Sequence, residues 1–436
     1  MPPFGRAMRD AHFSFAPSYT PLNHGSFGAF PHAVQHYQLL LRRETEARPD
    51  TFIRFRYPGL LREAREAIAP LLGAKTDEVV FVPNALTGIN TALRNLTYQD
   101  GDVIIYFSTI YGSCLKTIES LAETTPVRGF PIELTYPVED GDILDMFRTA
   151  LLMIQIQGRR PRVAMFDTVL TFPGVRFPWE MLVETCKDYG ILSCVDGAHG
   201  VGHIDLTHTA QTGPDFFISS CYKWLMVPRG CAILHVPFRN HHWIKTSYPT
   251  AEGYLPERER PDSHTAYFVG LFDKVSTVDT SPYLSVPESL RFRDQVCGGE
   301  KALRDYSIRL ARDGGKLMAE MMQTEVLENK SQTLGDCCFT NVRLPLDISQ
   351  IATDTCKRDG VSSDVSHTKA RTVADWITER SVNEFDSFLA TRYYAGGFWT
   401  RLSSQIYLEQ ADFEWAARVL TELCNRVKRG EWERRR

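Results

Sequence analysis

A single lysine between two large aromatic residues is the first candidate for chemistry in this sequence. Lys223 lies in the segment SSCYKWLMVPRG, after Tyr222 and before Trp224, and the apolar run CAILHVP follows soon after it. A lysine in a dry pocket either pairs with a carboxylate or has its pKa lowered and becomes a nucleophile. An isolated lysine is more often at the surface, with its stem on apolar neighbours. Residues elsewhere in the chain therefore have to decide between these roles.

Several polar and aromatic side chains follow predicted strands, at the points where the strands end. Asp196 comes after the apolar run ILSCV, and Tyr111 lies between the run DVIIYFS and a predicted helix. A further strand leads into another helix, and free N–H groups at such a helix start attract anions. The first residues of this helix are Ala85, Leu86 and Thr87. Because ligands bind at the carboxyl ends of parallel strands, we expect these side chains and Lys223 to share one site.

Pyridoxal phosphate (PLP) explains this combination of side chains. The cofactor needs a lysine for a Schiff base, a carboxylate at its pyridine nitrogen, an aromatic face and a phosphate cup. We expect Lys223 to form the Schiff base, Asp196 to hold the pyridinium proton and Tyr111 to stack on the ring. Residues 85–87 would cradle the phosphate, and His199 would orient Asp196 or the ring oxygen.

Histidines and acids near Asp196 raise the question of a metal site. The segment HGVGHIDLTH holds His199, His203, Asp205 and His208. An H-x-x-x-H spacing binds metal only on a helix face, and the glycines here argue against a helix, so we expect no metal. Asp167 ends the run RVAMF, and its role stays open between a contact in the site and a structural residue at a strand end.

The elements that position these residues follow a regular order along the chain. Short apolar runs alternate with amphipathic helices over most of the sequence, which predicts an α/β fold with a mainly parallel sheet. After about residue 287 the pattern becomes more helical, with a few strands, which is typical of a smaller α+β domain. We therefore predict an N-terminal arm over residues 1–35, a large cofactor-binding domain over 36–286 and a small domain over 287–436.

Composition limits the partners and the location. The 436 residues carry a formal net charge of only −4, so no overall field favours nucleic acid or a membrane surface. The N-terminus lacks an apolar signal core, and no apolar run is long enough to span a bilayer. Ten cysteines without a CxxC pair indicate reduced thiols. We expect a cytoplasmic protein with a small-molecule substrate and no nucleic-acid or membrane partner.

The motifs, taken in order, resemble the class V aminotransferase family of fold-type I PLP enzymes. Within it they resemble the isopenicillin-N-epimerase-like branch, which is found widely in fungi. The matching segments are LNHGSFGAFP, VPNALTGIN, IYG, FDTVLTFPGVRFP, VDGAHGVG, CYKWLMVPRGCAILHVP and STVDTSPYL. The segments LRFRDQVCGGE and FWTRLSSQIYLEQADFEWA extend the resemblance almost to the end. It implies a seven-stranded, mainly parallel sheet flanked by helices, and a homodimer with the active site at its interface.

The resemblance also assigns substrate and interface roles. Arg401, in WTRLS, would hold the substrate α-carboxylate in a bidentate fork, although a structural salt bridge is the alternative. Thr277, in STVDTS, would contact the phosphate across the dimer interface. Asn23 and His24 would line the mouth of the substrate pocket.

Two positions depart from the family pattern. The family usually reads His-Lys-Trp at the lysine, whereas Tyr222 precedes Lys223 here. A tyrosine, with a pKa of about 10, is a weaker base than histidine but a good hydrogen-bond donor. Leu86 stands where threonine is common, so the phosphate would depend on Thr87 and the backbone.

Several reactions remain open after the steps that the family shares. The substrate amine would displace Lys223 to form an external aldimine, and Lys223, alone or together with Tyr222, would remove the Cα proton to give a quinonoid. We favour carbon–carbon bond formation of the Mannich type, as in the cyclase of loline alkaloid synthesis, because the residue before the lysine has changed. A C–S lyase, like the hercynylcysteine sulfoxide lyase of ergothioneine synthesis, and an epimerase are alternatives. A non-catalytic dimeric binding relative is the alternative from another class, and the presence of Lys223, Asp196 and Arg401 argues against it.

Overall fold

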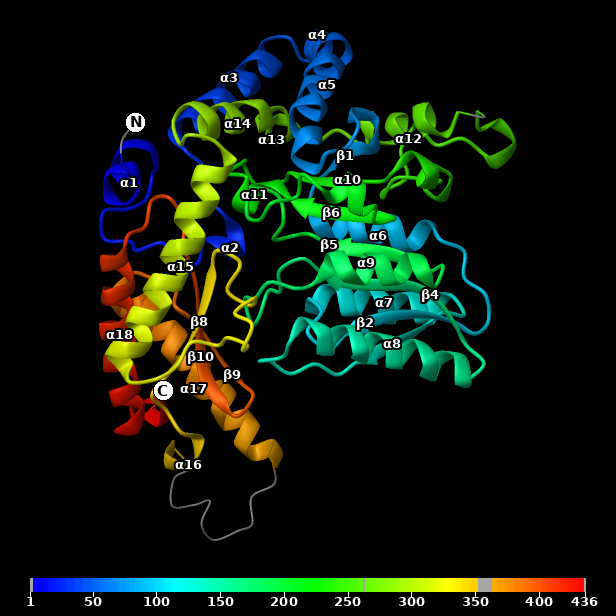
Figure 1. Cartoon of the computed structure of the whole chain (residues 1–436). Helices are drawn as coiled ribbons and strands as arrows, with labels where there is room; N and C mark the ends of the chain where they lie inside the picture. The colour runs from blue at the N-terminus through cyan, green and yellow to red at the C-terminus, as the bar shows by residue number, and fades with distance from the viewer. Residues whose placement is uncertain (1–2, 262, 352–362, 435–436) are drawn as a thin grey trace.

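A seven-stranded sheet forms the centre of the computed structural model, which describes residues 3–261, 263–351 and 363–434 (Figure 1). The strand order is β1-β7-β6-β5-β4-β2-β3. The strands are β1 (Val79–Val82), β2 (Asp102–Phe107), β3 (Arg128–Ile132), β4 (Arg160–Asp167), β5 (Leu192–Asp196), β6 (Phe216–Ser220) and β7 (Ala232–His235). Only β7 runs against its neighbours, so the predicted α/β fold with a mainly parallel sheet is confirmed.

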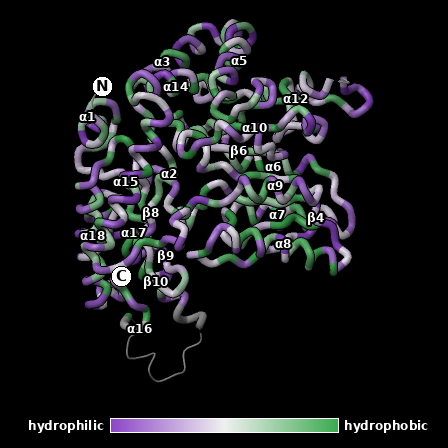
Figure 2. Tube along the Cα trace, in the orientation of Figure 1, coloured by the Kyte–Doolittle hydropathy of each residue, from purple (hydrophilic) through white to green (hydrophobic). Residues whose placement is uncertain are grey.

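Helices cover both faces of this sheet. Successive strand residues point to opposite faces, so Phe81 and Ile105 belong to one buried cluster, whereas Val80 and Ile104 belong to another. The first cluster includes α5 (Tyr57–Ile68), α8 (Asp140–Ile156) and α9 (Trp179–Asp188). The second includes α6 (Ala85–Asn95), α7 (Gly112–Thr124) and α12 (His264–Asp273). Figure 2 shows hydrophobic residues along the strand layer and hydrophilic residues on the outer loops, as expected for strands that are buried on both faces.

Shorter elements make up much of the remaining chain. The further helices are α1 (Arg6–His12), α2 (His24–Phe27), α3 (His32–Ala47), α4 (Pro49–Thr51), α10 (Thr209–Thr212), α11 (Cys221–Trp224), α13 (Ser281–Leu284) and α14 (Val286–Gln295). A π-helical segment, Phe52–Arg56, joins α4 to α5. The 3₁₀ segments are Ala69–Leu72, Thr76–Glu78, Phe238–Trp243, Glu257–Glu259 and Glu431–Arg434. None of the helices in the described ranges is long and apolar enough to cross a membrane.

A second, three-stranded antiparallel sheet has the order β8-β10-β9. Its elements are α15 (Glu300–Met322), β8 (Phe339–Arg343), α16 (Ile348–Ile351), α17 (Ser363–Phe385), β9 (Ala390–Tyr394), β10 (Gly397–Ser403) and α18 (Gln410–Lys428). The N-terminal segment is part of the same core, because Met8, Phe13 and Leu22 are buried in it. Arg9 also forms a buried ion pair with Asp412 at 2.6 Å. The segment 4–30 therefore packs with the C-terminal residues, and the predicted domain boundaries stay a prediction.

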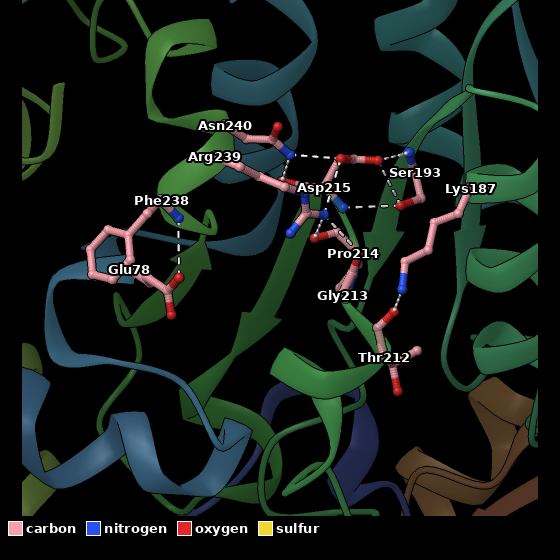
Figure 3. Close-up of polar contacts among 10 residues, drawn as sticks. All are labelled: Glu78, Lys187, Ser193, Thr212, Gly213, Pro214, Asp215, Phe238, Arg239 and Asn240. Carbon is pink, nitrogen blue, oxygen red and sulfur yellow. Dashed lines mark hydrogen bonds and ion pairs between the residues drawn. The ribbon is translucent and has the colours of Figure 1, made fainter.

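A polar network fixes the starts of β5 and β6, at the edge of the sheet opposite their functional ends. The carboxylate of Asp215 accepts hydrogen bonds from the Ser193 N–H at 2.9 Å and from Asn240 Nδ2 at 2.6 Å (Figure 3). Arg239 forms an ion pair with the same carboxylate at 3.2 Å. The two strands then run in parallel register toward Asp196 and toward the short helix that carries Lys223.

Candidate active site

One cavity of about 440 Å³ lies where the chain leaves the carboxyl ends of β4, β5 and β6. Eight residues proposed from the sequence line it: Ala85, Leu86, Tyr111, Asp196, His199, Tyr222, Lys223 and Arg401. The other lining residues were not proposed: Gly25, Ser26, Phe27, Asn84, Ile89, Cys114, Thr171, Ala198 and Ser220. The parallel strands bring most of these residues to one edge of the sheet, whereas Arg401 comes from β10 and residues 25–27 come from α2.

Lys223 projects into this cavity from the short helix α11. Burial lowers the pKa of Lys223 to about 8, although the nearby Asp196 carboxylate acts in the opposite direction. Its Nζ atom lies 3.3 Å from Nε2 of His199. A lysine amine with a lowered pKa is a nucleophile and a base near neutral pH, so this environment supports the reactive role rather than the surface role.

His199 has a defined tautomer in this arrangement. The indole Nε1–H of Trp224 donates to Nδ1 of His199 at 3.1 Å, and an indole nitrogen is a donor only. Burial, followed by the positive charges of Lys223 and Arg401, places the pKa of His199 well below its ordinary value. The imidazole is therefore neutral and carries its proton on Nε2, which faces the Lys223 amine.

Two carboxyl groups lie side by side below Lys223. Asp196 and Asp167 are register partners on β5 and β4, and both are buried. Asp196 accepts hydrogen bonds from the Ala198 N–H at 2.9 Å and from the Cys114 thiol at 3.5 Å. Burial and the charge of Asp196 raise the pKa of Asp167 well above its ordinary value. Burial also raises the pKa of Asp196, but the Ala198 hydrogen bond and the positive charge of Lys223 act in the opposite direction, so Asp196 holds the negative charge more readily than Asp167.

Arg401 is buried without an acidic partner in the described part of the chain. Its guanidinium donates to the Thr171 carbonyl at 2.5 Å, to Asn23 Oδ1 at 2.7 Å and to Ser26 Oγ at 3.1 Å. Its Nε–H has no acceptor among the described residues. Burial lowers the pKa of Arg401 to about 10. A buried cation with an unused donor fits an anionic ligand better than a structural salt bridge.

The start of α6 is only partly free to bind an anion. Asn84 caps this helix, because its Oδ1 accepts the Thr87 N–H at 2.8 Å and the Thr87 hydroxyl at 3.1 Å. Thr87 and Thr277 line a different cavity, of about 410 Å³. The buried hydroxyl of Ser220 lies near the Tyr222 phenol and lowers its pKa, but it makes no hydrogen bond of normal geometry among the described residues, and it lines the cavity with Lys223. A phosphate there would meet Ser220 and the backbone of residues 85 and 86, instead of the Thr87 side chain.

Asn23 and His24, expected to line the mouth of the substrate pocket, are not among the residues that line this cavity. His24 is only 4% exposed and points away from the cavity lining, toward the Lys223 carbonyl and the Tyr407 hydroxyl. Asn23 holds Arg401 through its side-chain oxygen. Both residues therefore support other residues of the site, because α2 packs on the lysine segment.

Some lining residues had signals in the sequence that were not used. Ser220 ends β6 and follows an apolar run, as Asp196 does on β5. Cys114 is one helical turn after Tyr111, so both face the same edge of the sheet. No local signal pointed to Thr171, which contacts Arg401 only through the tertiary fold.

The residues of this cavity fit PLP. Lys223 supplies an amine with a lowered pKa, Asp196 supplies a buried carboxylate, and Tyr111, 46% exposed, has a face available for a ring. The unpartnered Ser220 hydroxyl and Arg401 Nε–H supply donors for a phosphate and a carboxylate. The fold and this set of side chains define a fold-type I PLP-dependent enzyme.

Comparison with known proteins gives the family. The model of the class V aminotransferase family matches residues 55–246. L-cysteine desulfhydrase-like protein lolT1 of Epichloe uncinata is 37% identical over 98% of this chain and 97% of its own length. Hercynylcysteine sulfoxide lyase of Schizosaccharomyces pombe is 28% identical over 97% of this chain and 98% of its own. The protein belongs to the class V aminotransferase family, as the motifs predicted, and its cofactor is PLP.

Solved structures share the fold. A cysteine desulfurase from Thermococcus onnurineus superimposes with a TM-score of 0.69 at 16% identity, over 97% of this chain and 98% of that one. A variant of C-DES with glycine covalently linked to its PLP cofactor gives a TM-score of 0.70 at 13% identity, over 93% of this chain and 97% of that one.

Proposed function

We propose that this PLP-dependent enzyme acts at the Cα of an α-amino acid and closes a carbon–carbon bond of the Mannich type. The observation that carries the amino-acid substrate is the meeting of Lys223, Asp196 and the unpaired Arg401 on one cavity. No other described lining residue is charged in its ordinary form, so Arg401 is the group for a substrate carboxylate.

Each charged or polar residue of the site has a role that follows from its chemistry. Arg401 binds the carboxylate and orients the amino acid, while the Lys223 amine accepts the Cα proton, as its pKa of about 8 allows. PLP, when bound, supplies an electron sink for the negative charge at Cα. Asp196 keeps a proton on the ring nitrogen. Burial raises the pKa of Tyr222, so Tyr222 acts as a hydrogen-bond donor and not as a base.

Ring closure is supported by three features. The chain resembles the branch that contains the loline-pathway cyclase, and its similarity to lolT1 spans nearly both full lengths. The residue before Lys223 departs from the family's histidine. The outer lining from Phe27, Leu86 and Tyr111 is uncharged, so it suits a substrate whose tethered imine or iminium folds back toward Cα.

A C–S lyase is the second candidate, because the names of lolT1 and the hercynylcysteine relative both denote C–S chemistry. In this reaction the Cα–H and Cβ–S bonds break, and the thiol or sulfenate leaves. Hydrolysis of the remaining dehydroamino acid by water then gives pyruvate and ammonia. Epimerisation, with the proton returned to the other face of Cα, is a third outcome of the same first step.

The deciding experiment uses PLP-loaded protein and two substrate panels. One panel contains cysteine and S-conjugated cysteines, and the other contains amino acids that carry a tethered amine and an aldehyde. Ring closure predicts a cyclic product that keeps all substrate carbons, without pyruvate. Pyruvate with a released sulfur compound would replace this proposal by the lyase. Protein with Lys223→Ala is the control for both panels.

We also propose a cytoplasmic homodimer in which Thr277 reaches the partner's phosphate site. The supporting feature is that Thr277 lines the largely apolar cavity beside the start of α6, where Phe81, Tyr283 and Val278 are also found. Light scattering of the purified protein tests the dimer. A monomer that binds PLP and turns over substrate would overturn it.

A further inference from the structure

His24 makes two hydrogen bonds that link distant parts of the chain. Its Nε2 lies 2.8 Å from the main-chain oxygen of Lys223, and its Nδ1 lies 2.6 Å from the Tyr407 hydroxyl. The helix α11 has only four residues, so the Lys223 carbonyl has no partner further along its own helix. His24 therefore satisfies a carbonyl at the residue that would carry the cofactor.

The two partners determine the tautomer of His24. A carbonyl oxygen only accepts, so Nε2 carries the proton and donates it to Lys223, and Nδ1 accepts from the Tyr407 hydroxyl. Burial lowers the pKa of His24 to about 3, and the cations Arg293 and Arg229 act in the same direction. His24 is therefore a neutral donor throughout the physiological pH range.

The segment around His24 is packed tightly on the lysine segment. Gly28 has a φ of 66°, and a Cβ atom there would lie 1.8 Å from the Tyr222 carbonyl oxygen. A Cβ atom at Gly25 would lie 2.4 Å from the Phe339 ring. The His24 and Trp224 ring centroids are 5.0 Å apart. This contact leaves little room for the backbone of residues 222–224 to shift while the hydrogen bond holds.

We propose that His24 is a positioning residue for Lys223, and that Tyr407 holds His24 in the required tautomer. His24 touches neither the cavity nor the amine, and it acts by fixing the main chain from which the Lys223 side chain enters the site. The inference rests on the proposed role of Lys223 as the cofactor lysine. His24 connects the N-terminal segment, the C-terminal domain and the main chain of Lys223 through two hydrogen bonds.

A set of variants in the PLP-loaded protein tests the proposal. His24→Leu removes both hydrogen bonds and Tyr407→Phe removes only the one to Tyr407, whereas His24→Gln keeps an N–H that can reach the Lys223 oxygen. We expect His24→Leu to lower kcat by about 10- to 100-fold, because small displacements of reacting groups are costly. It should also shift the pH midpoint of the cofactor's absorbance change. His24→Gln should restore most of the wild-type kcat and most of the wild-type absorbance midpoint.

The control is Tyr306→Phe, which removes a partly buried hydrogen bond from a tyrosine to the Leu408 carbonyl at 2.6 Å without touching His24. It should lower the unfolding temperature and leave the absorbance midpoint unchanged. The double variant Tyr407→Phe with His24→Leu should have the same kcat and the same absorbance midpoint as His24→Leu alone, because both substitutions act through one hydrogen-bond network. A folded His24→Leu protein with the wild-type midpoint and kcat, or an equal shift in Tyr306→Phe, would overturn the proposal.

A second readout needs no cofactor. Nitrogen-15 NMR of the PLP-free protein should show His24, assigned by its loss in His24→Gln, as an Nε2–H tautomer that does not titrate from about pH 5 to about pH 8. Tyr407→Phe should give a mixture of tautomers. An Nδ1–H tautomer or a titrating His24 would refute the proposal. Failure of borohydride to attach PLP to Lys223 would instead refute the proposed role of the lysine, whatever the NMR result.

Discussion

Nη2 of Arg401 lies 2.7 Å from Oδ1 of Asn23, and this amide oxygen stands where a carboxylate would give a stronger partner. The same nitrogen also donates to Ser26, and both acceptors are uncharged. Asn23, Ser26 and His24 belong to one short segment, so that segment contacts the guanidinium on one side and the Lys223 carbonyl on the other. A substrate carboxylate that takes over Arg401 donors therefore competes with the segment that holds Lys223 in place.

Arg401→Met should separate stability from activity. Removing a buried cation that lacks an ionic partner relieves a desolvation cost, but the acceptors on Thr171, Asn23 and Ser26 lose their donor, so the free energy of unfolding should change by about 2 kcal/mol or less. The loss of a charge-assisted fork to the substrate should lower kcat/KM by about 100-fold or more. Urea unfolding and steady-state kinetics measure the two effects. A large loss of stability with normal KM would show that Arg401 is structural.

The protonation of Lys223 should be visible in the PLP-free protein. With its pKa lowered to about 8, the amine should react with an acylating reagent at a rate that rises through about pH 8. Peptide mass spectrometry quantifies the reaction, and Lys223→Ala identifies the peptide. Between about pH 8 and pH 10.5 the unfolded chain binds more protons at this lysine than the folded protein. The free energy of unfolding should therefore rise with pH over that window, and a fall attributable to Lys223 would contradict the lowered pKa.

Asp196→Asn and Asp167→Asn form a matched pair. Asp196 carries the buried charge, so its amide variant should lower kcat by about 100-fold or more and alter the absorbance of bound PLP. Burial and the charge of Asp196 raise the pKa of Asp167 and favour its neutral form, so its amide variant should stay within a few-fold of wild type. Equal losses in both variants would mean that the two carboxyl groups share the charge.

Tyr222 should act as a hydrogen-bond donor and not as a base. Because burial raises its pKa, Tyr222→Phe should lower kcat by about tenfold without moving the limbs of the pH–rate profile. Tyr222→His, which restores the usual family residue, should add a limb near about pH 6.5. A profile that loses an alkaline limb in Tyr222→Phe would instead show that the phenol titrates during turnover.

Ser220 and Thr87 test the position of the phosphate. Ser220→Ala should weaken PLP binding by about tenfold, because its unpartnered hydroxyl faces the cavity. Thr87→Val should change the PLP affinity much less, since the Thr87 hydroxyl already donates to Asn84. Fluorescence titration of PLP-free protein gives both dissociation constants. The reverse order would place the phosphate at Thr87.

The α/β architecture and the central part of the site were predictable from the sequence alone. Lys223, Asp196 and Tyr111 each follow an apolar run that forms a strand, and parallel strands deliver their carboxyl ends to one edge of the sheet. This relation is local. The hydrophobic pattern determines where each strand forms, and the residues that follow it in the sequence lie at its carboxyl end. The residues that lie just after strands were therefore predictable without any knowledge of long-range packing.

The contacts of distant segments with Lys223 and its neighbours are visible only in the tertiary structure. Arg401 arrives on a strand of the second sheet, and His24 faces the lysine carbonyl instead of the pocket, because the N-terminal segment packs into the C-terminal core. The Thr87 hydroxyl donates to Asn84, which caps the same helix, and it does not line the cavity with Lys223. These contacts depend on how distant segments pack together and on which hydrogen-bond partners they bring into reach. A local pattern of residues contains no information on either.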